Sequence, residues 1–285
     1  MNDLKQGNKK ALQVSIVNDE VTFKCSAISG DLKITMKKKG PNNLFDFYEF
    51  SKDDGILLTN PTDYLMAIKL RVENDADGDN INSRFFTGGN HDYNNRMSGT
   101  KTATIDNLRF RVDGEEVSSF NGCCDQLVVE FDALVNAYNT TKEDGTGRNA
   151  MKIHYTLVIK SECVDFEIDL EALEDVVIER YNGVGFYLPD STIQFVGGKS
   201  GKYPITDMVN SESLSTTEII GETDRLQIRC RIEKEGLGMF TNNEFPYSAF
   251  STRDNKAYFM LISRDTALAK DEHCYLRGSY SFKAF

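Results

Sequence analysis

Apolar and polar residues alternate with a period of two along most of the chain. The segments LQVSIV (12–17), VTFKCSAI (21–28) and DLKITMK (31–37) alternate in this way, and Asn18-Asp19 and Gly30 separate them. A period of two places successive side chains on opposite faces of a strand. The three segments therefore predict an antiparallel meander.

The alternation continues to the C-terminus. Segment 163–173 alternates acidic and apolar residues, which indicates a sheet with one solvated and one buried face. Segment 125–138 fits both helical and strand spacing, and its β-branched and aromatic residues favour a strand. Segment 64–73 begins apolar, as a central strand would. Further strands are predicted at 104–117, 150–160, 175–181, 185–189, 192–196, 225–233, 256–264 and 275–285.

Helix signals are scarce. One short helix is predicted within 263–273, and the pattern over 211–220 is unclear. About fifteen strands are too many for an immunoglobulin-like unit and suit two large antiparallel sheets packed face to face. We predict an all-β fold, a large antiparallel two-sheet sandwich or super-sandwich with few short helices. One domain over 1–285 is favoured, and the alternative sets residues 1–60 apart because KKKGPNN and SKDDG are both loops.

Composition narrows the class of protein. The chain is 40% hydrophobic and 27% charged, as soluble globular proteins are. No run approaches the roughly 18 apolar residues of a membrane helix. A net charge of −11 argues against nucleic acid as a partner, and Lys37–Lys39 indicate a solvated turn. The first residues lack the apolar stretch of a secretion signal, and a virion or cell-surface location is our expectation.

The six cysteines are not arranged for a zinc site. None are in C-x-x-C spacing, whereas zinc ligands usually come in closely spaced pairs. Cys25, Cys163 and Cys230 lie within alternating apolar runs, so we expect buried, reduced thiols there.

The main candidate for ligand binding is the polar, Gly-rich segment FFTGGNHDYNNRMSGT (85–100). Gly88 and Gly89 permit positive φ and a close approach of a ligand or another backbone. Amide groups can bind sugar hydroxyls, while an aromatic face covers the C–H face of a sugar ring. The proposed ligands here are Asn90, His91, Tyr93 and Arg96. The alternative is a long polar loop whose glycines and asparagines serve turns.

Two neighbouring stretches add candidates for binding. Arg148 follows the flexible turn Asp144–Gly147, and a guanidinium suits carboxylate or phosphate ligands. His154 lies in the strand after it, where a histidine is more often a satisfied interior residue. Tyr187 belongs to a segment with glycines beside aromatics, which indicates either a stacking groove or a β-bulge.

One stretch carries a partial metal-binding pattern. Asp75, Asp77 and Asp79 alternate as in D-x-D-x-D calcium loops. The match is incomplete, because Gly78 comes one position early and Phe86 stands where the bidentate glutamate belongs. The alternative is an acidic surface loop. No cofactor is required by any pattern, and calcium is the one ion the sequence suggests.

Signatures of catalysis are absent from the sequence. There is no G-x-S-x-G elbow, H-E-x-x-H, P-loop or G-x-G-x-x-G opening a helix. Whether the chain is an enzyme stays open, and these absences favour a non-catalytic role.

The order of three motifs resembles a known module. FFTGGNHDYNN, SGTKTAT with Thr102-Ala103, and the later VDFEIDLEALEDVVIERYNGVGFY resemble a β-super-sandwich module of bacterial and phage surface proteins, found beside SGNH-type esterases or in tail proteins. The resemblance covers about residues 85–187, and Tyr181-Asn182-Gly183 departs from the family's YYG-like turn. It implies carbohydrate attachment or support of an esterase.

Three hypotheses follow. The first is a non-catalytic carbohydrate-recognition or accessory module of a phage tail or bacterial surface protein, whose partner is a polysaccharide or cell-wall glycan. The second is a mutarotase- or polysaccharide-lyase-like enzyme, in which His91 or His154 is the acid or base and Tyr93 or Tyr187 lies close by. The third is a structural virion component that forms a homo-oligomer.

Overall fold

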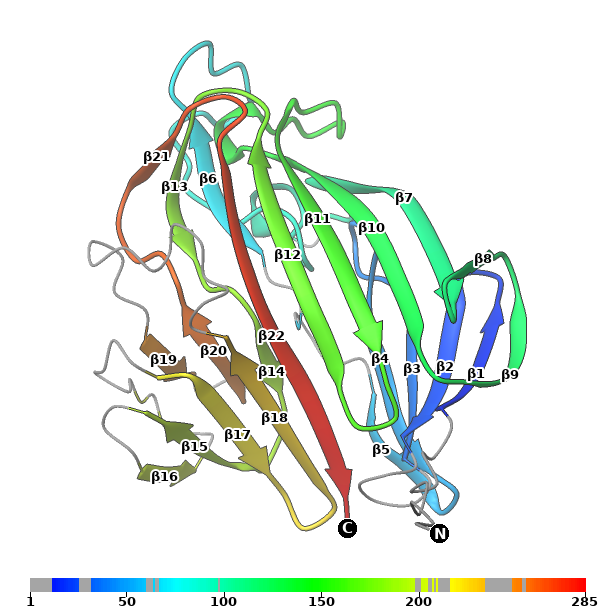
Figure 1. Cartoon of the computed structure of the whole chain (residues 1–285). Coiled ribbons are helices and arrows are strands. Elements are labelled where there is room, and N and C mark those ends of the chain that lie inside the picture. Colours follow the sequence, from blue (N-terminus) through cyan, green and yellow to red (C-terminus); the bar gives the residue numbers. More distant parts are fainter. Residues whose placement is uncertain are drawn as a thin grey trace, which may run out of the picture.

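The computed structural model shows an all-β molecule built from two layers of antiparallel strands (Figure 1). It describes residues 12–25, 32–59, 64, 67–96, 98–197, 201–204, 207, 209, 216–233, 248–252 and 255–285. Two 3-10 turns, η1 (Tyr93–Asn95) and η2 (Tyr138–Thr140), are the helical elements of this part. The predicted fold class is confirmed.

The first layer is a ten-stranded sheet. In spatial order its strands are β16 (Gly201–Pro204), β15 (Thr192–Val196), β17 (Glu218–Glu222), β18 (Leu226–Ile232), β22 (His273–Ala284), β12 (Val164–Ala172), β11 (Asn149–Ile159), β10 (Leu127–Asn136), β7 (Ala103–Val112) and β8 (Glu115–Val117).

The second layer consists of three smaller sheets. The six-stranded sheet has the order β5 (Gly55–Thr59), β4 (Leu44–Lys52), β3 (Leu32–Lys39), β2 (Glu20–Cys25), β1 (Leu12–Val17) and β9 (Phe120–Cys124). The two three-stranded sheets have the orders β21 (Thr266–Leu268), β13 (Val176–Tyr181), β6 (Ile68–Val72) and β14 (Gly185–Tyr187), β20 (Lys256–Met260), β19 (Ser248–Ser251).

The alternation of side chains along each strand determines which of them are buried in the core. On β11 and β12 the pair Tyr155 and Ile168 is buried, whereas the adjacent pair His154 and Asp169 is partly exposed. The acidic alternation predicted for 163–173 is therefore confirmed as one wet and one buried face.

Aromatic rings join the two layers. Phe47 of β4 lies 5.6 Å from both Tyr280 and Phe282 of β22, ring centroid to ring centroid. The Tyr280 hydroxyl shares its one hydrogen between the Gly185 carbonyl at 2.7 Å and the Tyr64 carbonyl at 3.0 Å. This buried hydroxyl ties the ten-stranded sheet to β14, because a buried O–H needs a partner.

The N-terminal strands share this core. β1 pairs with β9, and Phe45 of β4 packs edge-on against Phe110 of β7 and Phe131 of β10. One hydrophobic cluster contains residues from Leu12 to Ala284. The KKKGPNN and SKDDG loops are hairpin turns inside the six-stranded sheet.

Four sequence-based expectations need correction or completion. The helix predicted within 263–273 is wrong: Thr266–Leu268 form β21, which pairs with β13, and β22 begins at His273. The strand predicted from 64–73 is β6, which lies at the edge of its sheet and not at the centre. Segment 125–138 is a strand, as favoured, and is followed by η2. The unclear segment 211–220 contributes the start of β17, while 211–215 lie outside the described residues.

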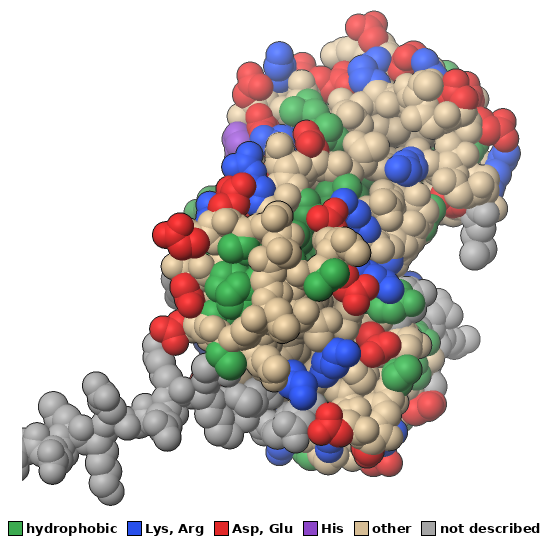
Figure 2. Space-filling view, turned by 90° about the vertical axis from the view of Figure 1, so that its right-hand side faces the viewer, with side chains coloured by type: hydrophobic (Ala, Val, Ile, Leu, Met, Phe, Trp, Pro, Cys, Tyr) green, Lys and Arg blue, Asp and Glu red, His purple; other side chains and the backbone are tan. Residues whose placement is uncertain are grey.

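The surface carries mixed charges. Figure 2 views the molecule from the right-hand side of Figure 1 and shows acidic and basic side chains interspersed with small apolar areas. Lys39 does not belong to a solvated turn, because its side chain is buried beside Asp46. Within the described ranges no helix has the length and apolarity needed to cross a bilayer.

The cysteines with described side chains are unpaired. Cys230 is buried as expected and Cys163 is half-buried, whereas the side chain of Cys25 lies outside the described part. Burial raises the pKa of the Cys230 thiol, so it acts as a small apolar group.

Candidate functional site

The 84–96 loop, which contains the main ligand-binding candidates, starts as an extended segment beside β6. Thr87 and Ile68 exchange two backbone hydrogen bonds, of 2.9 and 3.1 Å. Phe85 and Thr87 are buried, whereas Arg84 is exposed and Phe86 is partly exposed. This alternation directs Arg84 and Phe86 to the outer side of the loop.

Two buried side chains hold the loop from beneath. Asn42, in the turn between β3 and β4, donates through Nδ2 to the carbonyls of Gly89 and His91, each at 2.9 Å. Its Oδ1 accepts from the backbone N–H groups of Thr102 at 2.7 Å and Ala103 at 3.0 Å. One fully buried amide therefore satisfies four backbone groups, all of which lie 47–61 residues away in sequence.

Thr102 completes this support. Its hydroxyl donates to the His91 carbonyl at 2.6 Å and accepts from the Gly88 N–H at 3.0 Å. Gly88 and Gly89 have φ of +70° and +48°, which lets the chain turn sharply over Thr102. The paired glycines thus serve a tightly bonded turn, and this turn fixes the residues that follow.

The outer side of the loop presents a compact set of groups. The rings of Phe86 and His91 lie 5.4 Å apart, tilted by 36°. Nδ1 of His91 is hydrogen-bonded to Asn95 Oδ1 at 2.8 Å, and Asn95 and Arg96 are exposed. Two partly exposed rings bordered by amides and a guanidinium can stack against a sugar ring and bind its hydroxyls.

Tyr93 does not join this surface. Its side chain is buried, its ring packs against Phe85 at 6.3 Å, and its hydroxyl accepts a hydrogen bond from Asn80 Nδ2. The expected stacking role of Tyr93 is therefore corrected: this ring supports the loop from within. Phe86, which the sequence interpretation passed over, is the aromatic residue that faces outward beside His91.

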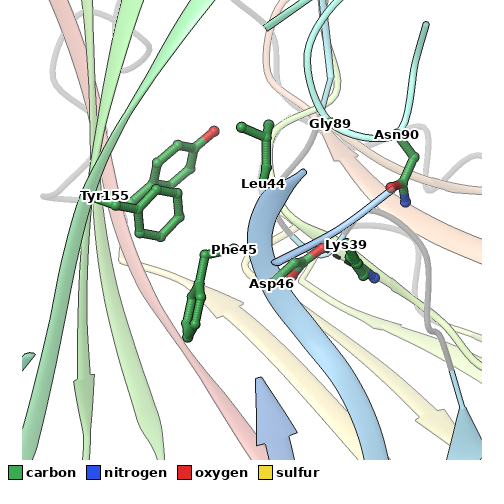
Figure 3. Close-up of a pocket in the computed structure, with 8 residues that line it drawn as sticks. Lys39, Leu44, Phe45, Asp46, Gly89, Asn90 and Tyr155 are labelled. Atoms are coloured by element: carbon green, nitrogen blue, oxygen red, sulfur yellow. Dashed lines mark ion pairs between the residues drawn. The ribbon is translucent and has the colours of Figure 1, made fainter. Parts of the chain in front are cut away.

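A small pocket lies beneath the turn of the loop (Figure 3). Tyr155 lies on the side of the ten-stranded sheet, and the buried ion pair Lys39–Asp46, at 3.5 Å, lies on the other with Gly89 and Asn90. The pocket has room for about one water molecule. It cannot admit a sugar ring, so a saccharide bound at this loop would contact the outer side of the loop.

Burial raises the pKa of the Tyr155 hydroxyl, and the Asp46 carboxylate raises it further. The tyrosine is therefore neutral at physiological pH and unsuited to act as a base.

The neighbouring loop 137–148 docks against the acidic segment 73–80. The Gly78 N–H donates to the Asn139 carbonyl at 2.9 Å, and Asp79 Oδ2 accepts from the Glu143 N–H at 2.7 Å. Both loops lie at the upper end of Figure 1. The Thr100 hydroxyl donates to the Glu143 carbonyl at 3.0 Å, which links this pair of loops to the C-terminal end of the 85–100 segment.

Arg148 is used within the protein. Its Nε and Nη2 donate to both Glu174 carboxylate oxygens at 2.8 and 3.2 Å, and its Nη1 donates to Asp77 at 3.1 Å. The hydrogen bond to Glu174 raises the pKa of the guanidinium. Arg148 therefore fastens the loops together and is not directed at a ligand.

The three aspartates of the partial calcium pattern are not gathered into a site. Asp77 pairs with Arg148 and with Lys142 at 3.2 Å, and Asp79 is bonded to backbone. Asp75 is exposed. Among the described residues no group of three or more histidine, cysteine or acidic side chains is arranged to hold a metal ion.

The remaining two candidates lie elsewhere. His154 points outward from the ten-stranded sheet, and its Nδ1 is bonded to the buried Asp132 at 2.7 Å. Tyr187 lies on β14 and packs against the core, while its neighbours Tyr181 and Phe186 are fully buried. In the described part no hydrogen bond, ion pair or ring contact joins Tyr187 to the loop residues or to Arg148. The candidate site is thus His91 and Arg96 together with Phe86, while Asn42 and Thr102 support it. Asn90, the remaining predicted ligand of this loop, lines the pocket beneath the turn.

Comparisons with known proteins identify the fold alone. No family model matches the sequence, and no curated protein does. The galactosidase domain of the α-galactosidase–sucrose kinase AgaSK is similar in structure, with a TM-score of 0.53 and 9% identity over 95% of this chain and 42% of that one. The GH36 α-galactosidase AgaB from Geobacillus stearothermophilus gives 0.51 and 8%, over 95% and 41%. The chain therefore spans about two fifths of each of these two structures, and the likeness is one of architecture.

Proposed function

We propose that the chain is a non-catalytic carbohydrate-recognition or accessory module, and that the 84–96 loop binds a polysaccharide or cell-wall glycan. The observation that carries the proposal is the outward Phe86–His91 ring pair on a loop fixed by Asn42 and Thr102. A surface that is already ordered loses little conformational entropy when it binds. A phage tail or bacterial surface protein is the setting we favour, following the resemblance of the 85–187 motifs.

The similar architecture in two α-galactosidases supports a carbohydrate-related role by analogy. Fold likeness does not determine function, so the argument rests on the loop. Because the chain spans about two fifths of those structures, an accessory role beside another domain is consistent with its size.

The acid–base candidates of the enzyme alternative, His91, His154 and Tyr93, have no contact with one another in the described part of the chain. Such catalysis requires groups that reach one substrate within hydrogen-bond distance. The His91 ring is bonded to Asn95, the His154 ring is bonded to Asp132 on the outer sheet face, and Tyr93 is buried. A non-catalytic surface therefore fits these contacts better.

A glycan array with labelled protein tests the proposal. We expect binding to at least one saccharide, and Phe86→Ala or His91→Ala should weaken it about tenfold, as the loss of one ring contact worth about 1.4 kcal/mol predicts. Phe285→Ala and His273→Ala are matched controls, because both residues are exposed and distant from the loop in sequence.

Absence of binding to every saccharide would contradict the proposal, as would equal losses in all four variants. A defined trimer or larger ring in light scattering, together with no glycan binding, would instead support the structural role.

A further inference from the structure

A cluster of cations lies on the outward face of β6 and β13, beside the candidate loop. Lys69 and Arg71 alternate with buried residues of β6, and Arg84 is the first residue of the 84–96 loop. All three lie near Glu179 of β13, whose side chain is only 5% exposed.

The cations outnumber the carboxylate that they surround. Lys69 Nζ lies 3.5 Å from Glu179 Oε2, and Nε of Arg71 and Nε of Arg84 each lie 3.6 Å from Oε1. The one hydrogen bond to this carboxylate among the described residues comes from the Tyr138 hydroxyl, at 2.5 Å. Glu179 therefore attracts the three cations without occupying their N–H donors.

Few other anions compensate these cations. Lys69 and Arg84 have no second ion pair in the described part of the chain. Arg71 also faces Asp265 at 3.8 Å and Glu73 at 4.0 Å, and these side chains are about half exposed. Exposed pairs at such distances are weak and are screened by salt.

Arg180 adds a cation without a carboxylate. It lies opposite Lys69 across a bulge in the β13–β6 pairing, so the two side chains are cross-strand neighbours. Its Nε donates to Asn182 Oδ1 at 2.8 Å and its guanidinium lies 5.3 Å from the centre of the Phe250 ring. Burial lowers the pKa of this guanidinium, and no carboxylate of the described residues pairs with it.

This cluster is continuous with the candidate saccharide surface. Arg84 and Phe86 are two residues apart in an extended segment and share its outer side. Such side chains lie about 7 Å apart, which is within the span of one monosaccharide unit and its substituents. The ring of Phe85, on the buried side of the same segment, lies 6.1 Å from the ring of Tyr138. The Tyr138 hydroxyl is in turn bonded to Glu179, so this contact links the segment to the carboxylate of the cluster.

We propose that Arg84, Lys69 and Arg180 bind the anionic group of an acidic saccharide, a carboxylate or a sulfate ester, while Phe86 and His91 contact its ring. This inference rests on the proposed carbohydrate role and specifies its ligand. Planar guanidinium groups with unoccupied N–H donors suit both anions. A chain with a net charge of −11 repels polyanions in general, so binding of one requires a local site of this kind.

Affinity electrophoresis in native gels that contain dextran, dextran sulfate or polygalacturonate tests this inference. We expect one or both acidic polymers to retard the protein more than dextran does, and the comparison between them separates sulfate from carboxylate. Arg84→Gln and Arg180→Gln should raise the dissociation constant about tenfold, as expected for loss of a charged hydrogen bond. Arg84→Lys should restore part of the affinity.

Arg277→Gln is the matched control, because Arg277 also has a single loose ion pair, to Glu233 at 3.8 Å, on the other layer. Thermal unfolding of each variant verifies the fold, and Arg84, whose side chain is 65% exposed, is replaceable without loss of packing. Retardation by the acidic polymers no greater than by dextran, or an equal loss in Arg277→Gln, would overturn the inference.

Two outcomes separate this inference from the broader role. Neutral glycan binding that depends on Phe86 but not on Arg84 would overturn the anion site and leave carbohydrate recognition standing. Binding of an acidic polymer that depends on Arg84 but not on Phe86 would support the anion site and count against the loop as the saccharide surface.

Discussion

The charged side chains of two solvated sheet faces of this molecule are paired in different ways. On the outer face of the ten-stranded sheet, several cations have a carboxylate partner of their own on an adjacent strand, as in Lys152–Glu171 at 3.4 Å and Arg229–Glu218 at 3.2 Å. On the outward face of β6 and β13, Lys69, Arg71 and Arg84 share the buried Glu179, and Arg180 has no carboxylate partner in the described part. Cations in one-to-one pairs on the first face are neutralised within the protein, whereas the cluster on the second face retains N–H donors for a ligand.

The largest expected effect is a difference in unfolding free energy between carboxylate substitutions on the two faces. Glu179→Gln should lower the free energy of unfolding by about 3 kcal/mol, the lower end for breaking a buried ion pair, because Lys69 and Arg71 are mostly buried whereas Arg84 reaches solvent. Glu171→Gln, on the ten-stranded sheet, should cost less than about 1 kcal/mol. Urea unfolding measures both, and similar small losses would contradict the distinction.

The next effect concerns the support of the loop that borders the cation cluster. Asn42→Ala should lower stability by about 2–3 kcal/mol, because it leaves four buried backbone groups without a partner. Proteolysis within 88–96 should become faster. Asn121→Ala, at an exposed position of β9, is the control, and equal proteolysis of the two variants would show that Asn42 does not fix the loop.

A smaller effect should appear as pH dependence on the ten-stranded sheet. Burial alone would raise the pKa of Asp132, but hydrogen bonds from Asn107 at 2.8 Å and His154 at 2.7 Å outweigh it and lower the pKa. The carboxylate then stabilises the fold above its unfolded pKa of about 3.9, and this contribution is lost as pH falls through the lower folded value. Asp132→Asn should cost about 1 kcal/mol at pH 7.

That difference between wild type and Asp132→Asn should narrow as the pH falls below about 4. Unfolding measured from pH 7 to pH 2 checks the trend, and a constant difference would contradict it.

The smallest effect is expected for a matched surface pair. Arg229→Gln should change stability by less than about 0.5 kcal/mol and leave the affinity for acidic polymers unaltered, because both partners of the Arg229–Glu218 pair reach solvent. A loss of affinity comparable with that of Arg84→Gln would show that the two faces do not differ in function.

The sequence predicts the layers well and some elements poorly, for physical reasons. Alternation reveals β11, β12 and β22 because each has one wet and one buried face. Thr266–Leu268 consists partly of good helix formers, and pairing with β13 overrides that local preference. β4 was not predicted, since bulges in its pairing with β3 and β5 interrupt the period of two.

The candidate site is harder to predict from the sequence than the strands are. The polar, Gly-rich loop is visible in the sequence, but whether Tyr93 or Phe86 faces outward depends on the backbone bonds of Thr87. Asn42 supports the loop through bonds to residues 47–61 positions away, and no local pattern marks such a contact. The cation cluster likewise combines three separate segments, so it exists only in the folded chain.

Hydrogen–deuterium exchange with and without oligogalacturonate or dextran sulfate tests the central claim most directly, because it locates the bound saccharide on the molecule. We predict slower exchange in residues 84–96, in β6 and in β13. Slower exchange confined to β11, β12 and β22, with no change in residues 84–96, would contradict the account.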